Sequence, residues 1–125
     1  RTLYLYDVSS KTYKRIVDFQ YFFEAKPVPE QPGYYYSYNN IRCDGAKWNS
    51  ELFVIKDFEV DKLARISANQ CLHSTQRQLE VEVPNGQYRY KLIEKFSYDT
   101  LDKTKGYKWH FMENYWRVNA QTFAR

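Results

Sequence analysis

The sequence predicts a mainly β (β-rich α+β) protein, a single compact antiparallel sandwich or partly open barrel of six or seven strands with one short helix at about residues 58–69. Aromatic residues make up 19% of the 125 residues. Most stand in short runs where they alternate with charged or polar residues, which is the pattern of half-buried strands. Turn-forming sequences separate these runs. No sequence repeats at a period of roughly 20 to 50 residues, so a repeat architecture is excluded.

Size and hydrophobicity favour one domain that spans residues 1–125. The chain is 43% hydrophobic, which suffices for one core without metals or many disulfides. Its longest apolar run, residues 52–55, is far shorter than the roughly 20 residues of a membrane helix. The chain opens on Arg1 without an apolar signal segment. We therefore expect a soluble domain with no membrane span and with a processed or trimmed start.

The N-terminal quarter predicts a hairpin, a further strand and a loop. Residues 2–6 and 11–17 are rich in β-branched and aromatic residues, and they flank the turn-forming residues 7–10. This arrangement is typical of a β-hairpin. Residues 18–25 are expected to continue the sheet. Residues 26–33 contain three prolines, which exclude a central strand or a helix and favour an extended surface loop.

A tyrosine-rich strand is predicted over residues 34–42. Because side chains alternate along a strand, Tyr35 points to one face and Tyr34, Tyr36 and Tyr38 point to the other. Not all of these rings can therefore reach a single core.

A second strand and the predicted helix follow. A turn at residues 44–45 precedes a buried strand over residues 51–56. The next segment changes period, and Asp57 is a suitable N-cap for a helix over residues 58–69. The positions that share one face at helical spacing are Val60, Leu63, Ala64, Ser67 and Cys71.

A hairpin is predicted over residues 79–92. The dipeptide Asn85-Gly86 is typical of a two-residue hairpin turn. With this turn one face is apolar and the other carries opposite-charge pairs, and each cross-strand pair contributes roughly 0.2 to 1 kcal/mol. A slip of one residue would put glutamates in the core. The expected pairs are Val83 with Tyr88, Glu82 with Arg89, Val81 with Tyr90, Glu80 with Lys91 and Leu79 with Leu92.

The C-terminal part predicts a connection, a strand and a tail. Residues 97–106 form the connection. Residues 107–118 form a last long strand, in which Tyr107, Trp109 and Phe111 share one face. Residues 119–125 are a flexible tail that either frays or docks.

Two cysteines, Cys43 and Cys71, are separated by enough chain for one disulfide. Both lie beside turn-like sequence, and we expect them to be bonded in an exported protein. The alternative is two free, buried thiols in a cytosolic protein. Zinc prefers four ligands, and neither a Cys-x-x-Cys motif nor a cluster of Cys and His is present. We therefore expect no metal and no cofactor.

No motif in the chain indicates catalysis. It has no phosphate-binding Gly-Lys loop, no nucleophile elbow and no His-Glu-x-x-His helix. Nothing in the sequence brings His73 and His110 together, and Glu80 and Glu82 are explained by cross-strand cations. No catalytic residue is assigned, and a non-enzymatic protein is favoured.

The charge balance mildly favours anionic partners. The chain has 19 basic and 15 acidic residues, a formal net charge of +4, and a pI near 9.0. Rings alternate with cations in residues 13–15, 88–91 and 107–110. On a strand this alternation puts rings and cations on opposite faces, whereas a single-strand nucleic-acid groove needs both together.

The surplus of aromatic residues supplies the candidate binding site. Consecutive rings such as those at residues 34–36 and 115–116 cannot share one face, so some must lie near the surface or in a second cluster. Exposed Tyr and Trp side chains are common interface anchors. The candidate binding residues are Tyr35, Tyr36, Tyr38, Trp48, Tyr98, Tyr115 and Trp116.

We therefore expect a secreted, non-enzymatic binding domain that engages a protein or glycan partner through these rings. One alternative is a nucleic-acid-binding module or a small RNase-like domain, whose phosphate contacts would make binding steeply dependent on salt. Another is a secreted effector or toxin-associated protein.

Overall fold

The computed structural model describes residues 3–16, 24–103 and 107–124. Their strands form two antiparallel sheets. The smaller sheet is the hairpin of β1 (Tyr4–Asp7) and β2 (Thr12–Arg15). The larger sheet has seven strands in the order β3-β4-β6-β7-β8-β9, with β5 also paired to β6. The predicted mainly β, antiparallel class is confirmed.

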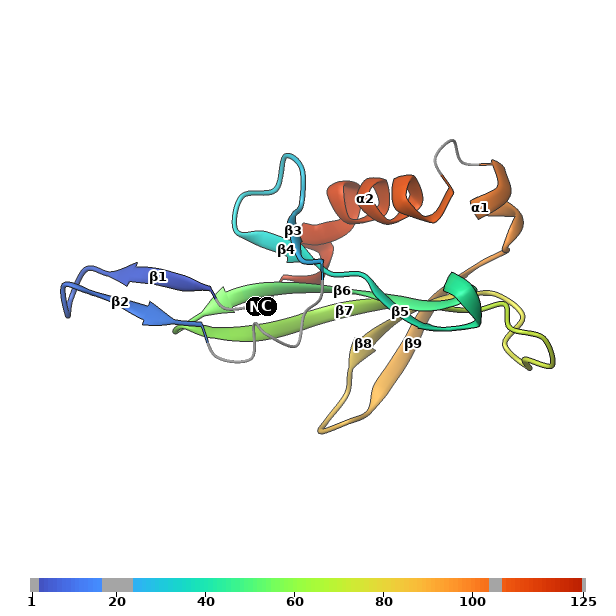
Figure 1. The fold of residues 1–125 in the computed structure, drawn as a ribbon, viewed down its shortest axis with the longest axis horizontal. Helices are drawn as coiled ribbons and strands as arrows, with labels where there is room; N and C mark the ends of the chain where they lie inside the picture. The colour runs from blue at the N-terminus through green and yellow to red at the C-terminus, as the bar shows by residue number, and fades with distance from the viewer. Residues whose placement is uncertain (1–2, 17–23, 104–106, 125) are drawn as a thin grey trace.

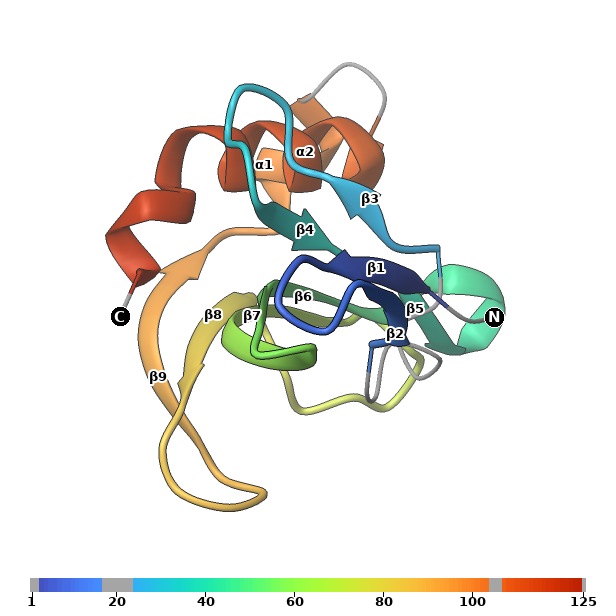
Figure 2. The ribbon, with the colours of Figure 1, turned by 90° about the vertical axis from the view of Figure 1, so that its left-hand side faces the viewer.

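The seven strands of the larger sheet are β3 (Lys26–Pro27), β4 (Tyr34–Tyr36), β5 (Asn39–Arg42), β6 (Lys47–Lys56), β7 (Glu59–Asn69), β8 (Leu79–Pro84) and β9 (Tyr90–Phe96). The helical elements are the 3₁₀ turn η2 (Cys43–Gly45), α1 (Asp99–Lys103), α2 (Tyr107–Asn119) and the 3₁₀ turn η3 (Ala120–Phe123). The β1–β2 hairpin projects beyond the ends of β6 and β7 (Figure 1). Helix α2 lies over one side of the sheet, and the β8–β9 hairpin curves toward the other (Figure 2).

Two apolar cores occupy the two faces of the large sheet. The main core lies between the sheet and α2, and its largest fully buried side chains include Trp48, Leu52, Ile66 and Trp116. The second core is built around Ile16 and Phe53 on the opposite face. Partly buried side chains complete it, namely Leu3, Ala25, Tyr35, Ile55, Phe58 and Val60.

The predicted helix at residues 58–69 is wrong, because this segment is strand β7. It pairs with β6 along its whole length, from Lys56 opposite Glu59 to Lys47 opposite Asn69. The pairing register shifts after Leu52, which leaves Leu63 as an extra residue on β7. That bulge buries Leu63 beside its neighbour Ala64 and interrupts the alternation of the strand. With the bulge, the apolar residues of this strand are spaced like those on one face of a helix, which is why the sequence predicted a helix.

The predicted strand at residues 107–118 is also wrong, because this segment is helix α2. Its buried residues recur at alternating intervals of three and one, which is the period of one helix face. They are Lys108, Phe111, Met112, Tyr115 and Trp116. The connection before it contains α1, whose Leu101 is fully buried.

The hairpin of β8 and β9 forms with a different register from the predicted one. Pro84 pairs with Tyr90, which leaves a loop over residues 85–89 closed by the Asn85 amide donating to the Arg89 carbonyl at 2.9 Å. The strand next to β8 explains the shift, because Arg65 of β7 pairs with the Glu82 carboxylate at 3.1 Å and stacks over the Tyr90 ring at 3.5 Å.

The remaining segments agree more closely with the predictions from the sequence. The first hairpin is confirmed, and residues 34–42 form β4 and β5 with Tyr35 on the face opposite to Tyr36. Residues 51–56 lie within β6. The proline-rich segment 26–33 is only partly a surface loop, because β3 pairs with β4 and Val28 is buried. Most of residues 18–25, predicted to continue the sheet, lie outside the described residues.

The described part of the C-terminal tail, residues 119–124, docks against the main core. Ala120 of η3 is fully buried, and the Phe123 ring lies 6.0 Å from the Trp116 ring, centroid to centroid. These contacts join η3 to the main core. Among the described residues, no helix is long and apolar enough to cross a membrane.

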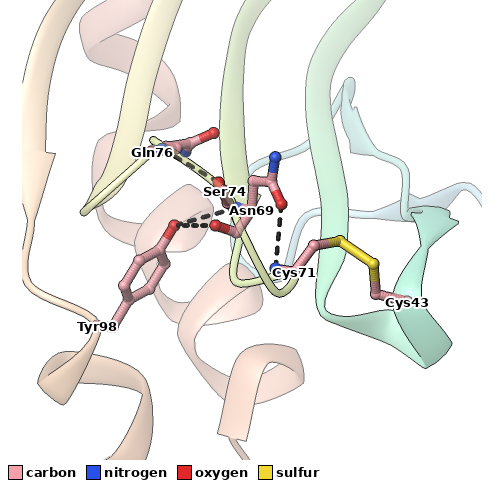
Figure 3. The surroundings of a disulfide bond; sticks show 6 residues. All are labelled: Cys43, Asn69, Cys71, Ser74, Gln76 and Tyr98. Atoms are coloured by element: carbon pink, nitrogen blue, oxygen red, sulfur yellow. Dashed lines mark hydrogen bonds between the residues drawn. A yellow bond between two sulfur atoms is a disulfide. The ribbon is translucent and has the colours of Figure 1, made fainter.

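The disulfide between Cys43 and Cys71 is present, with 5.7 Å between the two Cα atoms. It joins η2 to the loop that follows β7 (Figure 3). That loop is further held by the Cys71 amide, which donates to the Asn69 side chain at 3.1 Å. The Tyr98 hydroxyl also bonds both the amide and the carbonyl of Asn69 (Figure 3).

Candidate partner-binding surface

The aromatic residues predicted to form an exposed site belong instead to the cores. Tyr36, Tyr38, Trp48, Tyr115 and Trp116 are all buried, and Tyr35 and Tyr98 are half-buried. The large sheet buries rings on both of its faces, so Tyr35 and Tyr36 are both covered. Tyr115 and Trp116 share the buried face of helix α2. These side chains therefore do not form the exposed site that was predicted, whereas Tyr35 lies in a second cluster, which was the alternative expectation.

Most of these rings have a hydrogen-bond partner for their polar tip, as buried Tyr and Trp usually do. The Tyr36 hydroxyl donates to Glu113 at 3.2 Å, and the Tyr115 hydroxyl donates to Glu94 at 2.8 Å. The Trp116 indole donates to the Ser50 hydroxyl at 2.9 Å. Burial, with the nearby Glu113 carboxylate, raises the pKa of Tyr36 to about 12. These contacts are those of structural side chains.

Tyr38 and Trp48 contribute to a cluster around Lys108, a buried lysine at the start of α2. The Lys108 ammonium donates to the Tyr38 hydroxyl at 2.7 Å and to the Gly45 carbonyl at 2.9 Å. The half-exposed Trp109 ring packs 4.3 Å from the Tyr38 ring, centroid to centroid. The cluster therefore ties α2 to η2 and β6.

Three exposed aromatic residues lie on the β1–β2 hairpin, while Tyr88, Tyr107 and Trp109 are exposed elsewhere on the protein. Tyr4, Tyr6 and Tyr13 are 56%, 50% and 72% exposed. Tyr6 lies opposite Tyr13, with the ring centroids 5.2 Å apart in an edge-to-face arrangement, and Tyr4 lies opposite Arg15. Side chains directly opposite in a hairpin share a face. These four residues therefore form one surface, which we call the tyrosine face.

The other face of the hairpin anchors it to the protein. Ile16 is fully buried in the second core, and its amide donates to the Leu3 carbonyl at 2.7 Å. The Lys14 ammonium lies 5.2 Å from the centroid of the Phe58 ring. The base of the hairpin is thus packed while its tyrosine face meets solvent.

The tip of the hairpin is organised by Asp7. Its carboxylate accepts from the Ser9 amide at 3.1 Å and from the Ser9 and Ser10 hydroxyls at 2.8 Å each. The Lys14 ammonium lies 2.8 Å from the same carboxylate. Lys14 and the two serines hold the pKa of Asp7 well below its usual range. Such Asx-type contacts define the turn and hence the register that places the tyrosines.

Rings and cations share the tyrosine face, contrary to the separation expected from their alternation. Tyr13 and Arg15 are two residues apart in β2 and so point the same way. Residues 3–16 contain Lys11, Lys14 and Arg15 and one acidic residue, Asp7, which is a formal charge of +2. A sequence signal was available, because the first strand alternates Leu3, Tyr4, Leu5 and Tyr6 and so puts two tyrosines on one face.

A separate cleft lies between α2 and β9, with a volume of about 310 Å³. It holds His110 together with a carboxylate, Glu94. His73 lies in the loop between β7 and β8 and does not line this cleft. The remaining lining residues are Phe96, Thr100, Phe111, Asn114, Tyr115, Val118 and Asn119. Within the described residues, no group of three or more His, Cys, Asp or Glu side chains could hold a metal ion.

Comparison with known proteins gives no relative: no family model, no characterised sequence and no solved structure matches this chain significantly.

Proposed function

We propose that this protein is a non-enzymatic binding domain that engages an acidic protein surface through its tyrosine face. The observation that carries the proposal is the grouping of Tyr4, Tyr6, Tyr13 and Arg15 on the exposed face of a hairpin outside the large sheet. Tyrosine and arginine are among the residues that dominate binding energy at protein interfaces. Rings on a paired strand also lose little freedom on binding.

The charge of the hairpin supports an acidic partner. The formal charge of +2 over residues 3–16 would accelerate encounter with a negative surface and disfavour a positive one. The disulfide supports an exported protein, because structural disulfides persist mainly in oxidising compartments.

The test is selection of binding peptides from a random displayed library with the wild-type protein. We expect the selected peptides to be rich in Asp and Glu. They should bind a Tyr4→Thr/Tyr6→Thr/Tyr13→Thr variant at least about 100-fold more weakly, since each interface tyrosine contributes on the order of 1 kcal/mol or more. Threonine keeps the strand propensity of the hairpin.

The matched control is Leu92→Thr, which removes an exposed side chain from strand β9 and should leave peptide binding unchanged. Circular dichroism spectra of the variants are compared with that of the wild type to check that each variant keeps its fold. Peptides that bind the triple variant as well as the wild type, or that show no acidic bias, would contradict the proposal.

The shared location of the rings and Arg15 also suits a single-stranded nucleic acid, which is the second candidate. An oligonucleotide titration at two salt concentrations separates the two partners. Binding that needs the three tyrosines and weakens steeply between low and physiological salt would assign the face to nucleic acid instead of protein.

A further inference from the structure

The α2–β9 cleft has the size and lining of a small-molecule site. Its volume of about 310 Å³ lies at the lower end of the roughly 300 to 1,000 Å³ that ligand pockets occupy. The walls include the side chains of Phe96, Phe111, Tyr115 and Val118. A few polar groups, among them His110 and Asn114, line the same cleft. This mixture of apolar walls and sparse polar groups is typical of ligand pockets.

The charge of the cleft is opposite to that of the whole molecule. The protein carries a formal charge of +4, yet among the described residues that line the cleft there is no lysine or arginine, and Glu94 is the one acidic residue. Tyr115 donates to the Glu94 carboxylate at 2.8 Å, which orients that carboxylate against the helix. In the part of the chain that the structure describes, Glu94 forms no salt bridge.

Aromatic rings stand beside this carboxylate. The Phe96 ring meets the Phe111 and Tyr115 rings edge to face, at centroid distances of 5.6 Å and 5.7 Å. The negative faces of such rings attract a cation that lies over them. A carboxylate and several rings in one cleft therefore favour the same kind of ligand, one with a positive charge and an apolar body.

We propose that the α2–β9 cleft binds an organic ammonium group carried on an apolar or aromatic body. Glu94 would supply the counter-charge, and Phe96, Phe111 and Val118 would cover the apolar part. Tyr115 acts as a positioning residue, because its hydroxyl orients the Glu94 carboxylate. This site shares no residue with the tyrosine face, so it is independent of the proposed partner binding.

The test is a titration of the ¹⁵N-labelled protein followed by nuclear magnetic resonance. The probe is phenethylammonium, and phenylacetate serves as its counterpart of opposite charge. We expect phenethylammonium to shift the resonances of His110, Asn114 and Asn119, and phenylacetate to bind at least several-fold more weakly. Glu94→Gln should weaken phenethylammonium binding roughly twofold to fivefold, as expected for the loss of one exposed charge.

The matched control is Glu59→Gln, which removes the same charge from an exposed position at the start of β7. It should leave the affinity unchanged. Equal affinity for the two probes, an unchanged affinity in Glu94→Gln, or the absence of shifts at millimolar phenethylammonium would overturn the proposal.

The same chemistry occurs in free amines and in the lysine side chain of a peptide. A parallel titration with acetyl-Phe-Lys-amide distinguishes these sources. Tighter binding of the dipeptide than of phenethylammonium would assign the cleft to a peptide, and weaker binding would assign it to a free amine. Both results require the loss of affinity in Glu94→Gln.

Discussion

Lys108 shows how a buried charge can be accommodated with no acidic partner among the described residues. A buried ammonium is costly unless its donors are hydrogen-bonded. Lysine has three donors, and Lys108 uses two of them on the Tyr38 hydroxyl and the Gly45 carbonyl. The same ammonium lies 4.8 Å from the centroid of the Tyr38 ring. These contacts require the backbone at Gly45 to approach the lysine closely.

We expect Gly45→Ala to destabilise the protein by about 2 to 3 kcal/mol. Its φ of +94° is strained for alanine, and the added Cβ would lie 2.8 Å from the Lys108 ammonium. Strain at positive φ costs about 1 to 2 kcal/mol, and displacing a buried hydrogen-bonded charge adds about 1 kcal/mol or more. Urea unfolding measures the change.

The control for this substitution is Gly33→Ala. Gly33 has a similar φ of +86°, but no atom lies within 4 Å of the position of its added Cβ. It therefore reports the backbone strain alone. If the two variants lose the same free energy of unfolding, the close approach of Lys108 to Gly45 does not contribute to the destabilisation.

Tyr36 predicts a loss of stability at alkaline pH. Its pKa is raised from 10.0 to about 12, first by burial and then by Glu113. A raised pKa in the folded state means that the unfolded chain loses this proton first. The stabilising contribution is therefore complete below pH 10 and is lost as the pH rises toward 12. Unfolding free energies should fall across this window, and by less in Tyr36→Phe.

Other tyrosines contribute to the same decline. Burial also raises the pKa of Tyr90, Tyr98 and Tyr115, so the Tyr36→Phe variant keeps part of the pH dependence. The difference between the two profiles isolates Tyr36. Parallel profiles from pH 10 to 12 would show that Tyr36 titrates alike in the folded and unfolded chain.

At the scale of elements, the local pattern of apolar and polar residues predicted strands correctly where the strand pairs with a segment that is near in the sequence. The β1–β2 hairpin and the strands near residues 34–42 and 51–56 carry alternating or continuous apolar patterns, and they formed as predicted. The wrong predictions concern segments whose structure depends on contacts with residues far away in the sequence. The bulge at Leu63 disguised β7, and Arg65 of β7 holds Glu82 and Tyr90 in a shifted register.

The disulfide is an element-level constraint with a measurable effect. It links η2 to the loop after β7, between two cysteines with a sequence separation of 28. Such a cross-link stabilises a protein by roughly 3 to 4 kcal/mol, mainly through the entropy of the unfolded chain. Reduction, or the Cys43→Ala/Cys71→Ala variant, should lower the free energy of urea unfolding by this amount.

The two treatments serve as controls for each other. Reduced wild-type protein and the double alanine variant should unfold at the same urea concentration, because both lack the cross-link. Midpoints equal to that of the oxidised protein would mean that the β6–β7 ladder alone constrains this loop.

At the scale of the whole molecule, the protein has a large main core and a smaller second core. The main core covers one face of the large sheet under α2, whereas the second core anchors the base of the β1–β2 hairpin. A two-stranded hairpin is at best marginally stable alone. The tyrosine face therefore sits on a hairpin that is backed by the smaller, second core.

We expect the amides of β1 and β2 to exchange with deuterium faster than those of β6 and β7. Local opening of a weakly packed hairpin requires less free energy than global unfolding, which limits exchange in central strands. The Ile16 amide should be the slowest of the hairpin, because Ile16 is fully buried and its amide is hydrogen-bonded. Exchange resolved by nuclear magnetic resonance tests this order.

The predicted order of exchange would be contradicted if the amides of Tyr6 or Tyr13 were as well protected from exchange as those of the central residues of β6 and β7. That result would mean that the hairpin unfolds only with the whole protein.

The sequence by itself determined the mainly β class and the first hairpin, because these depend on local alternation and turn residues. It limited a disulfide to one possible pair of thiols, and the tertiary structure decided that Cys43 and Cys71 are bonded. Only the tertiary structure decided that residues 107–119 are helical and that residues 59–69 are a strand. It also decided which rings are exposed. Burial depends on what lies opposite each face, and the large sheet covers rings on both of its faces while the tyrosine face of the small hairpin stays open to solvent.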